Sequence, residues 1–128
     1  MSLFRYGKDG GPASTVWGLW LLEAKRLCSV VLLCFENGSR NAYHSHAFDS
    51  VSWVLRGRLV EHHLGGTTEM HMPSWRPVIT RRETFHKVVS GGRTWVLSFR
   101  GPWARYWQEY LPAELRFVRL AVGRQEVA

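Results

Sequence analysis

The sequence predicts a single all-β domain of the sandwich or jelly-roll type. The chain has 128 residues, of which 45% are hydrophobic, including seven Trp and six Phe, and this suits one domain with one core. Short segments rich in β-branched and aromatic residues recur along it, with glycine-containing turn signals between them. A parallel α/β fold is disfavoured because the pattern offers no crossover helices.

The N-terminal part begins with a segment that is rich in turn residues. Residues 1–16 include Gly7, Gly10, Gly11 and Pro12, which predicts an irregular arm ahead of the first element. Strands are expected over 17–23 and 27–36, where β-branched and aromatic residues are frequent. A helix over 19–27 is the alternative, and the pattern alone does not exclude it.

The middle of the chain predicts a series of hairpins. Asn37-Gly38 is a strong turn pair, and one or two strands are expected over 42–57, ending at Gly57. Gly65-Gly66 and Gly91-Gly92 indicate further turns. The remaining central strands are expected over 58–64, 70–75, 77–80, 84–90 and 94–100.

The C-terminal part is less regular. Residues 102–112 predict an aromatic arm or a helical turn. Arginine alternates with apolar residues over 115–122, which predicts a half-exposed edge strand. The barrel is therefore expected to span 17–122, and residues 123–128 are expected to form a tail.

Three histidines are the candidate metal ligands. His44 and His46 are two residues apart, and in an extended chain such residues share one face about 7 Å apart. His86 lies forty residues downstream in a similar setting. If the strands bring the three imidazoles together, the set suits a divalent transition metal better than Mg or Ca.

The spacing around these histidines resembles the first motif of the cupin superfamily. Five residues separate Gly38 from His44-Ser45-His46, and Gly57 closes the run. Ser50 stands where that family has a glutamate ligand. The second cupin motif matches only at His86. The run 74–103 is similar to small stand-alone cupins of bacteria and bacteriophages.

The resemblance covers about residues 17–101 and implies a double-stranded β-helix, the cupin jelly-roll barrel, with a metal at its mouth held by His44, His46 and His86. The missing glutamate makes the site similar to three-histidine iron dioxygenases of that superfamily. Iron is therefore expected before Zn, Ni or Mn. Asp49 is the alternative ligand if a bulge turns it inward, although strict alternation gives it the opposite parity to the histidine pair.

Other residues are candidates for the substrate pocket. Ser50 occupies the glutamate position, and Arg100 ends a strand with a parity that suits a carboxylate clamp; an exposed strand end is the alternative for Arg100. His62 and His63 are adjacent and face opposite sides of a strand. Both are expected to be ordinary strand residues, and a place for His62 in the pocket is the alternative.

These features favour a metal-dependent, dioxygenase-like enzyme acting on a small anionic molecule. The alternatives are a non-catalytic module that binds a small anion, a nucleotide or nucleic acid, and a cupin isomerase or epimerase. The net charge of +7 is compatible with nucleic-acid binding, but charge balance alone does not favour it. No secretory signal or membrane-length apolar run is visible, so a cytoplasmic protein without a membrane partner is expected. The apolar first strands and the aromatic segment predict a homodimer.

Overall fold

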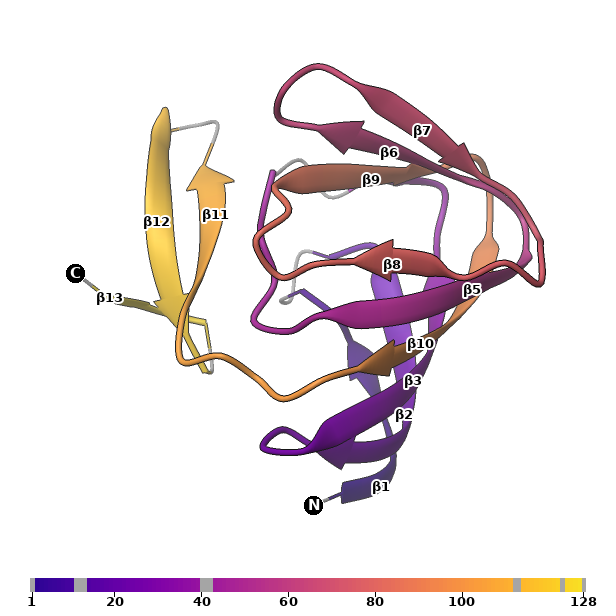
Figure 1. The fold of residues 1–128 in the computed structure, drawn as a ribbon, viewed down its shortest axis with the longest axis horizontal. Helices are drawn as coiled ribbons and strands as arrows, with labels where there is room; N and C mark the ends of the chain where they lie inside the picture. The colour runs from indigo at the N-terminus through magenta and orange to yellow at the C-terminus, as the bar shows by residue number, and fades with distance from the viewer. Residues whose placement is uncertain (1, 11–13, 40–42, 112–113, 123, 128) are drawn as a thin grey trace.

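The structure is a computed structural model that describes residues 2–10, 14–39, 43–111, 114–122 and 124–127. Within these ranges the chain is all β (Figure 1). The strands are β1 (Ser2–Lys8), β2 (Val16–Ala24), β3 (Cys28–Phe35), β4 (Gly38–Ser39), β5 (Ser50–Arg56), β6 (Leu59–His63), β7 (Thr68–His71), β8 (Val78–Thr80), β9 (His86–Ser90), β10 (Thr94–Arg100), β11 (Trp107–Leu111), β12 (Arg116–Ala121) and β13 (Gln125–Val127).

The largest sheet has six strands in the order β1-β2-β3-β10-β5-β8, with antiparallel pairs throughout. Alternate residues of β10 are buried, as expected when one face of a sheet covers a core. The core that this face supports includes Trp20, Val31, Val54 and Val96. The strands predicted over 17–23 and 27–36 are therefore confirmed, and the alternative helix over 19–27 is wrong.

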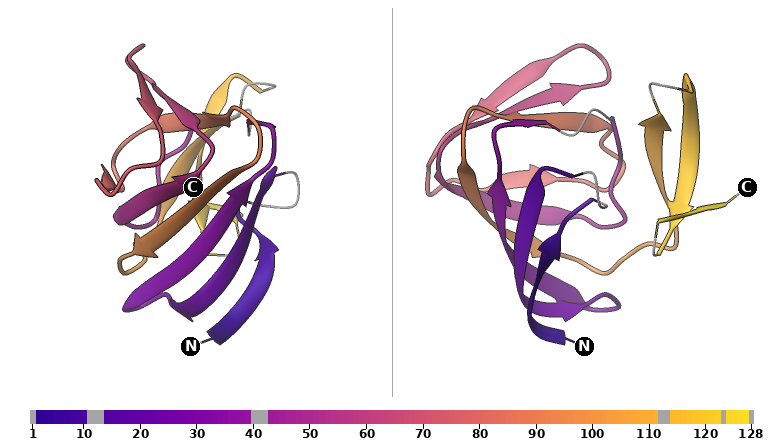
Figure 2. Two further views of the ribbon diagram at one scale, coloured as in Figure 1. Left: turned by 90° about the vertical axis from the view of Figure 1, so that its right-hand side faces the viewer. Right: turned by 180° about the vertical axis from the view of Figure 1, so that it is seen from behind.

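A second sheet has the order β4-β9-β6-β7 and lies across the top of the barrel in Figure 1, facing the six-stranded sheet. Figure 2 shows from two further sides how the two sheets curve around a common interior. Leu59 of β6 contributes to the core from this sheet. The arrangement confirms the predicted all-β jelly-roll barrel.

The third sheet, β11-β12-β13, lies beside the open end of the barrel (Figure 1). It is joined to the histidine segment by backbone hydrogen bonds from Ser45 to the carbonyl of Gln108 and from Tyr110 to the carbonyl of Tyr43, at 2.9 and 2.8 Å. The aromatic arm or helical turn predicted over 102–112 is thus wrong over Trp107–Leu111, which is a strand. A paired partner strand, which local sequence does not reveal, converts this segment into β structure.

Three further boundaries differ from the sequence prediction. The irregular arm expected over 1–16 is wrong for Ser2–Lys8, because β1 pairs with β2 along its length; the glycines at 7 and 10 lie near the turn rather than marking an unstructured arm. Gln125–Val127 is a strand paired with β12, not a tail. For the same reason β12 is the central strand of its sheet, not an edge strand.

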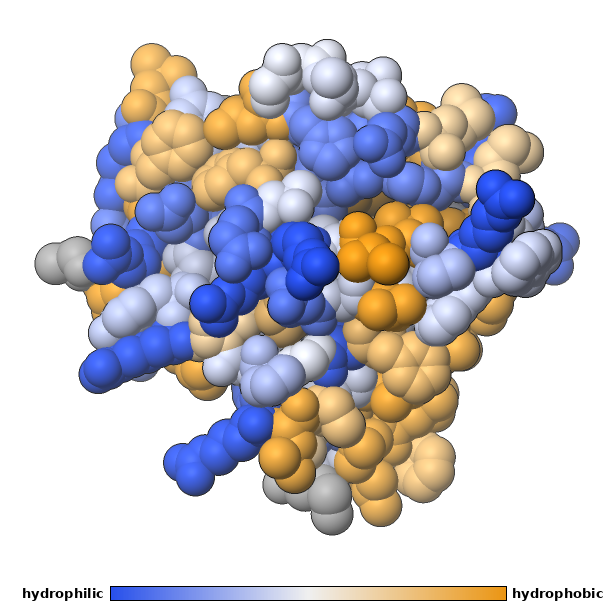
Figure 3. All heavy atoms as spheres, in the orientation of Figure 1, coloured by the Kyte–Doolittle hydropathy of each residue, from blue (hydrophilic) through white to orange (hydrophobic). Residues whose placement is uncertain are grey.

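The surface is uneven in polarity. Hydrophobic side chains gather over the lower part of the molecule, where β1 to β3 lie, whereas the surface over β6 and β7 is mainly hydrophilic (Figure 3). In the part of the chain that the structure describes, no helix has the length and apolar character needed to cross a bilayer.

Candidate metal centre

The histidine pair lies on a short bridging segment between β4 and β5, where His44 pairs with β9. His44 and His86 exchange two backbone hydrogen bonds, at 2.9 and 3.0 Å. The backbone of His46 donates to the carbonyl of Arg82 at 3.2 Å. Ser45, between the two histidines, points its hydroxyl the other way and accepts a hydrogen bond from the backbone of Gln108. The alternation expected for an extended segment therefore holds outside a regular strand.

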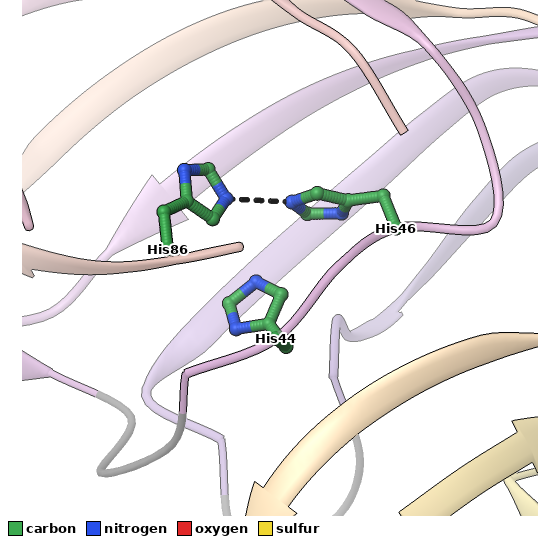
Figure 4. Close-up of side chains that lie close together, drawn as sticks. All are labelled: His44, His46 and His86. Atoms are coloured by element: carbon green, nitrogen blue, oxygen red, sulfur yellow. Dashed lines mark hydrogen bonds between the residues drawn. The ribbon is translucent and has the colours of Figure 1, made fainter. Parts of the chain in front are cut away.

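The three imidazoles converge (Figure 4). Their ring centroids are 4.7 to 5.1 Å apart, and one ligating nitrogen from each lies within 4.8 Å of the others. The Nε2 atoms of His46 and His86 are 2.8 Å apart. This confirms the convergence of His44, His46 and His86 that the sequence predicts.

Glu61 of β6 orients His86 from behind. Its carboxylate is buried and bonds to Nδ1 of His86 and, at 2.8 Å, to Nε2 of His71. Burial alone would raise the pKa of Glu61, but the hydrogen bonds from His86 and His71 outweigh it and lower the pKa to about 2. An ionised carboxylate only accepts hydrogen bonds, so the proton of His86 is on Nδ1.

This proton position suits metal binding. With Nδ1 protonated, the lone pair of His86 is on Nε2, which faces His46. Two imidazole nitrogens bound at about 2.1 Å and at right angles on one ion are about 3 Å apart, close to the 2.8 Å observed. A carboxylate behind a metal-binding histidine is the usual way to fix its tautomer and ring orientation. The residues present therefore fit a transition-metal ion.

No carboxylate at the expected fourth position completes the set. Among the described residues, the group around the three imidazoles contains no carboxylate oxygen. Asp49 is exposed, and its Oδ1 accepts a hydrogen bond from the backbone of Arg82 at 2.8 Å, so the structure does not bring it to the imidazoles. Ser50 begins β5 opposite Thr80 and Arg100 and lines the cavity described next.

A cavity of about 350 Å³ opens beside the imidazoles inside the barrel, within the size range of small-molecule sites. Apolar side chains from both sheets form much of its wall. Phe48 and Trp103, with ring centroids 5.4 Å apart, form an aromatic wall next to His46. The segment after β10 thus contributes to the pocket, which its sequence did not reveal.

Arg100 lies in this cavity and is buried. Its guanidinium pairs with both carboxylate oxygens of Asp9, at 2.7 and 3.3 Å, and lies 4.6 Å above the ring of Phe48. The alternative of an exposed strand end is therefore wrong. Its role as a clamp for a substrate carboxylate stays a prediction, since Asp9 already occupies two of its donors.

The structure does not place His62 in the pocket. It has the opposite parity to Glu61 and His63 on β6 and lines neither the cavity beside the imidazoles nor a second cavity against β8. The sequence interpretation did not identify Glu61 and His71 as residues near the site. Both could have been found only from the pairing of β6 with β9 and β7, because this register brings Glu61 close to His86 and His71.

No known family profile and no curated protein sequence matches this chain. Solved structures do. A cupin-superfamily sugar phosphate isomerase from Silicibacter pomeroyi has a TM-score of 0.67 at 15% identity, over 99% of this chain and 92% of the other. The polyketide cyclase RemF from Streptomyces resistomycificus has a TM-score of 0.64 at 18% identity, over 77% and 73%. A cupin from Desulfitobacterium hafniense has a TM-score of 0.58 at 18% identity, over 68% and 77%. The chain therefore has the cupin fold.

Proposed function

We propose that this protein is a metal-dependent enzyme that acts on a small anionic molecule, with iron-dependent dioxygenation as its reaction. The observation that carries the proposal is a set of three imidazoles, with no carboxylate among them in the described residues, at the wall of a 350 Å³ cavity. His44, His46 and His86 would hold the ion. Because the three ligands are neutral, the ion's charge stays uncompensated and favours an anionic ligand from the substrate.

When bound there, iron would supply the redox chemistry and the open coordination positions that dioxygenation requires. The chain itself supplies the remaining functions. Glu61 holds the ring of His86 in one orientation through its Nδ1. The aromatic wall of Phe48 and Trp103 limits the access of water to one side of the cavity.

Charge in the cavity supports an anionic substrate. Among the described residues that line it, five side chains are cationic and three are acidic. All three arginines in this lining pair with an acidic side chain of the protein: Arg5 with Glu23, Arg100 with Asp9, and Arg124 with Glu109. Lys25 differs, since its Nζ lies 4.7 Å above the ring of Trp103. We infer that Lys25 binds the part of the substrate that lies away from the imidazoles.

The reaction class is tested by oxygen uptake. Untagged protein is loaded anaerobically with Fe(II) and then mixed with oxygen and a panel of small thiols and carboxylates. Uptake that depends on one of these substrates and disappears in His46→Ala supports the proposal. Lack of oxygen uptake with every member of the panel counts against dioxygenation.

Lys25 has a matched control. Lys25→Met should raise KM for the substrate several-fold with a smaller effect on kcat, because Lys25 is placed to bind rather than to react. Lys87 lies 5.2 Å from the ring of Tyr43 and does not line the cavity, so Lys87→Met should leave KM unchanged. Equal effects of the two variants would contradict a binding role for Lys25.

Isomerisation of a sugar phosphate is the second candidate. The Silicibacter pomeroyi protein, which is similar over nearly the whole chain, is described as a sugar phosphate isomerase, and such substrates are anionic. This reaction needs no oxygen, so turnover of a sugar phosphate under anaerobic conditions by the Zn- or Mn-loaded protein would favour it. Thermal stabilisation by small anions without any turnover would instead indicate a non-catalytic binding module.

A further inference from the structure

A second group of potential metal ligands lies on the β6–β7 hairpin, on the other side of Glu61 from His86. Glu61 and Glu69 are directly opposite each other in the antiparallel pair. His63 and His71 each follow one of these glutamates by two residues along its strand, so all four side chains share one face of the hairpin. The spacing of these four residues along the chain does not by itself predict that they lie close together.

Glu61, Glu69 and His71 each offer one ligand atom within 4.8 Å of the other two, and His63 approaches both carboxylates. Nε2 of His71 lies 2.8 Å from Oε1 of Glu61 and 3.9 Å from Oε2 of Glu69. Nε2 of His63 lies 3.6 Å from Oε1 of Glu61 and 3.7 Å from Oε1 of Glu69. Ligands of a tetrahedral zinc ion at about 2.0–2.1 Å are about 3.3–3.5 Å apart. The separations of 3.6, 3.7 and 3.9 Å lie slightly above this value, and the 2.8 Å between His71 and Glu61 is a hydrogen bond that coordination would replace.

The two carboxylates of this group carry negative charge that a cation would compensate. Two carboxylates that face each other across a strand pair repel one another. Although the protein has a net charge of +7, neither Glu61 nor Glu69 contacts a lysine or arginine of the described residues; their ion-pair partners are the histidines. A divalent ion would compensate both carboxylates at once.

His63 provides an independent observation. Its Nε2 atom is buried and has no hydrogen-bond partner in the described part of the chain, yet it faces oxygens of Glu61 and Glu69 at 3.6 and 3.7 Å. A buried nitrogen without a partner is costly, and coordination to an ion between these groups would satisfy it. A cavity of about 280 Å³ between this face and β8 gives an ion access to the group.

We propose that His63, His71, Glu69 and Glu61 form a second site for a divalent transition-metal ion of the zinc type. Two imidazoles and two carboxylates are a donor set that zinc accepts in proteins. Glu61 connects the two centres, because its Oε2 bonds to His86 while its Oε1 lies beside His71 and His63. The proposal does not depend on the reaction proposed for the three-histidine centre.

Metal stoichiometry tests the second site. Untagged protein is stripped with a chelator and titrated with Zn(II), and bound zinc is then measured by elemental analysis after gel filtration. The native chain should bind two equivalents, and His63→Ala and Glu69→Gln should each bind one. His44→Ala should also bind one equivalent, because it affects only the other centre. Glu83→Gln, a change at an exposed glutamate outside the group, should still bind two.

Cobalt distinguishes the two sites by coordination. Co(II) in the hairpin site should give the intense visible absorption of a four-coordinate ion, and this band should persist in His44→Ala but disappear in His63→Ala. Circular dichroism of the metal-free variants shows whether each one is folded. A native chain that binds one equivalent, or a second equivalent that survives in folded His63→Ala and Glu69→Gln, would overturn the proposal. Loss of turnover without a change in stoichiometry would concern only the proposed reaction.

Discussion

His86 donates a hydrogen bond from Nδ1 to the buried carboxylate of Glu61, and its Nε2 faces His46 at 2.8 Å. A histidine of the candidate metal centre is thus held by a charged acceptor from a different strand. This relationship determines both the tautomer of His86 and the direction of its lone pair. It links the inner wall of β6 to the candidate metal centre.

Glu61→Gln should weaken metal binding at the three-histidine centre by about 10- to 100-fold, because the amide keeps the shape of the side chain but removes the charge that orients His86. A chelator competition in the His63→Ala background measures this centre alone. Glu83→Gln in the same background is the control. An unchanged affinity would show that Glu61 does not orient a ligand.

Removal of metal should destabilise the native chain. An ion that binds only the folded state adds about 2.7 kcal/mol of stability when its free concentration is 100 times Kd. We expect thermal unfolding with added Fe(II) or Zn(II) to shift to lower temperature on addition of chelator. In the double variant His44→Ala, His63→Ala the same chelator should have no effect. If chelator lowered the unfolding temperature of this variant as much as that of the native chain, the ion would bind elsewhere.

Gly57 should not tolerate a side chain. Its φ is +91°, and a Cβ would lie 2.8 Å from the backbone carbonyl oxygen of Arg93 and from Cα of Thr94. Gly57→Ala should therefore lower the free energy of unfolding by about 1–3 kcal/mol. A Cβ at Gly65 would meet no atom within 4 Å, so Gly65→Ala is the control for chemical denaturation. Equal stability of the two variants would contradict this steric argument.

The two cysteines should differ in reactivity. Cys28 is exposed and Cys34 is buried, and burial raises the pKa of the Cys34 thiol. Since the thiolate is the reactive form, a raised pKa slows Cys34 further at neutral pH. A thiol reagent should modify one cysteine rapidly in the folded chain and both after denaturation. In Cys28→Ser the rapid phase should vanish; if it remains, Cys34 is accessible.

The homodimer expected from the sequence stays a prediction. β1 is an edge strand with exposed apolar side chains, and Leu3 and Phe4 are 59% and 73% exposed. Such an edge favours pairing with a second copy. Light scattering should give the mass of a dimer, and Phe4→Ser should shift it toward the monomer. Trp75, which is 82% exposed near β8, offers the control Trp75→Ser. A native monomer would refute the expectation.

Much of the barrel could be predicted because its signals are local. The strand over Thr94–Arg100 follows from alternation and from the glycine turn before it, and the structure has the same bounds. β1 and β11 could not be predicted in the same way, since their neighbours in the sheets, rather than their own residues, decide that they are extended. Strand propensity is weak compared with such pairing.

Two features of the metal centre can be read from the chain alone: His44 and His46 share a face, and no glutamate stands at Ser50. Spacing and alternation are properties of the chain itself. The position of Glu61 behind His86 and the separation of Asp49 from the imidazoles come from the folded barrel. The approach of His63 and His71 to two carboxylates on the β6–β7 hairpin likewise comes from the folded barrel. These contacts depend on strand register, which is fixed by packing between distant segments and not by the residues at the site.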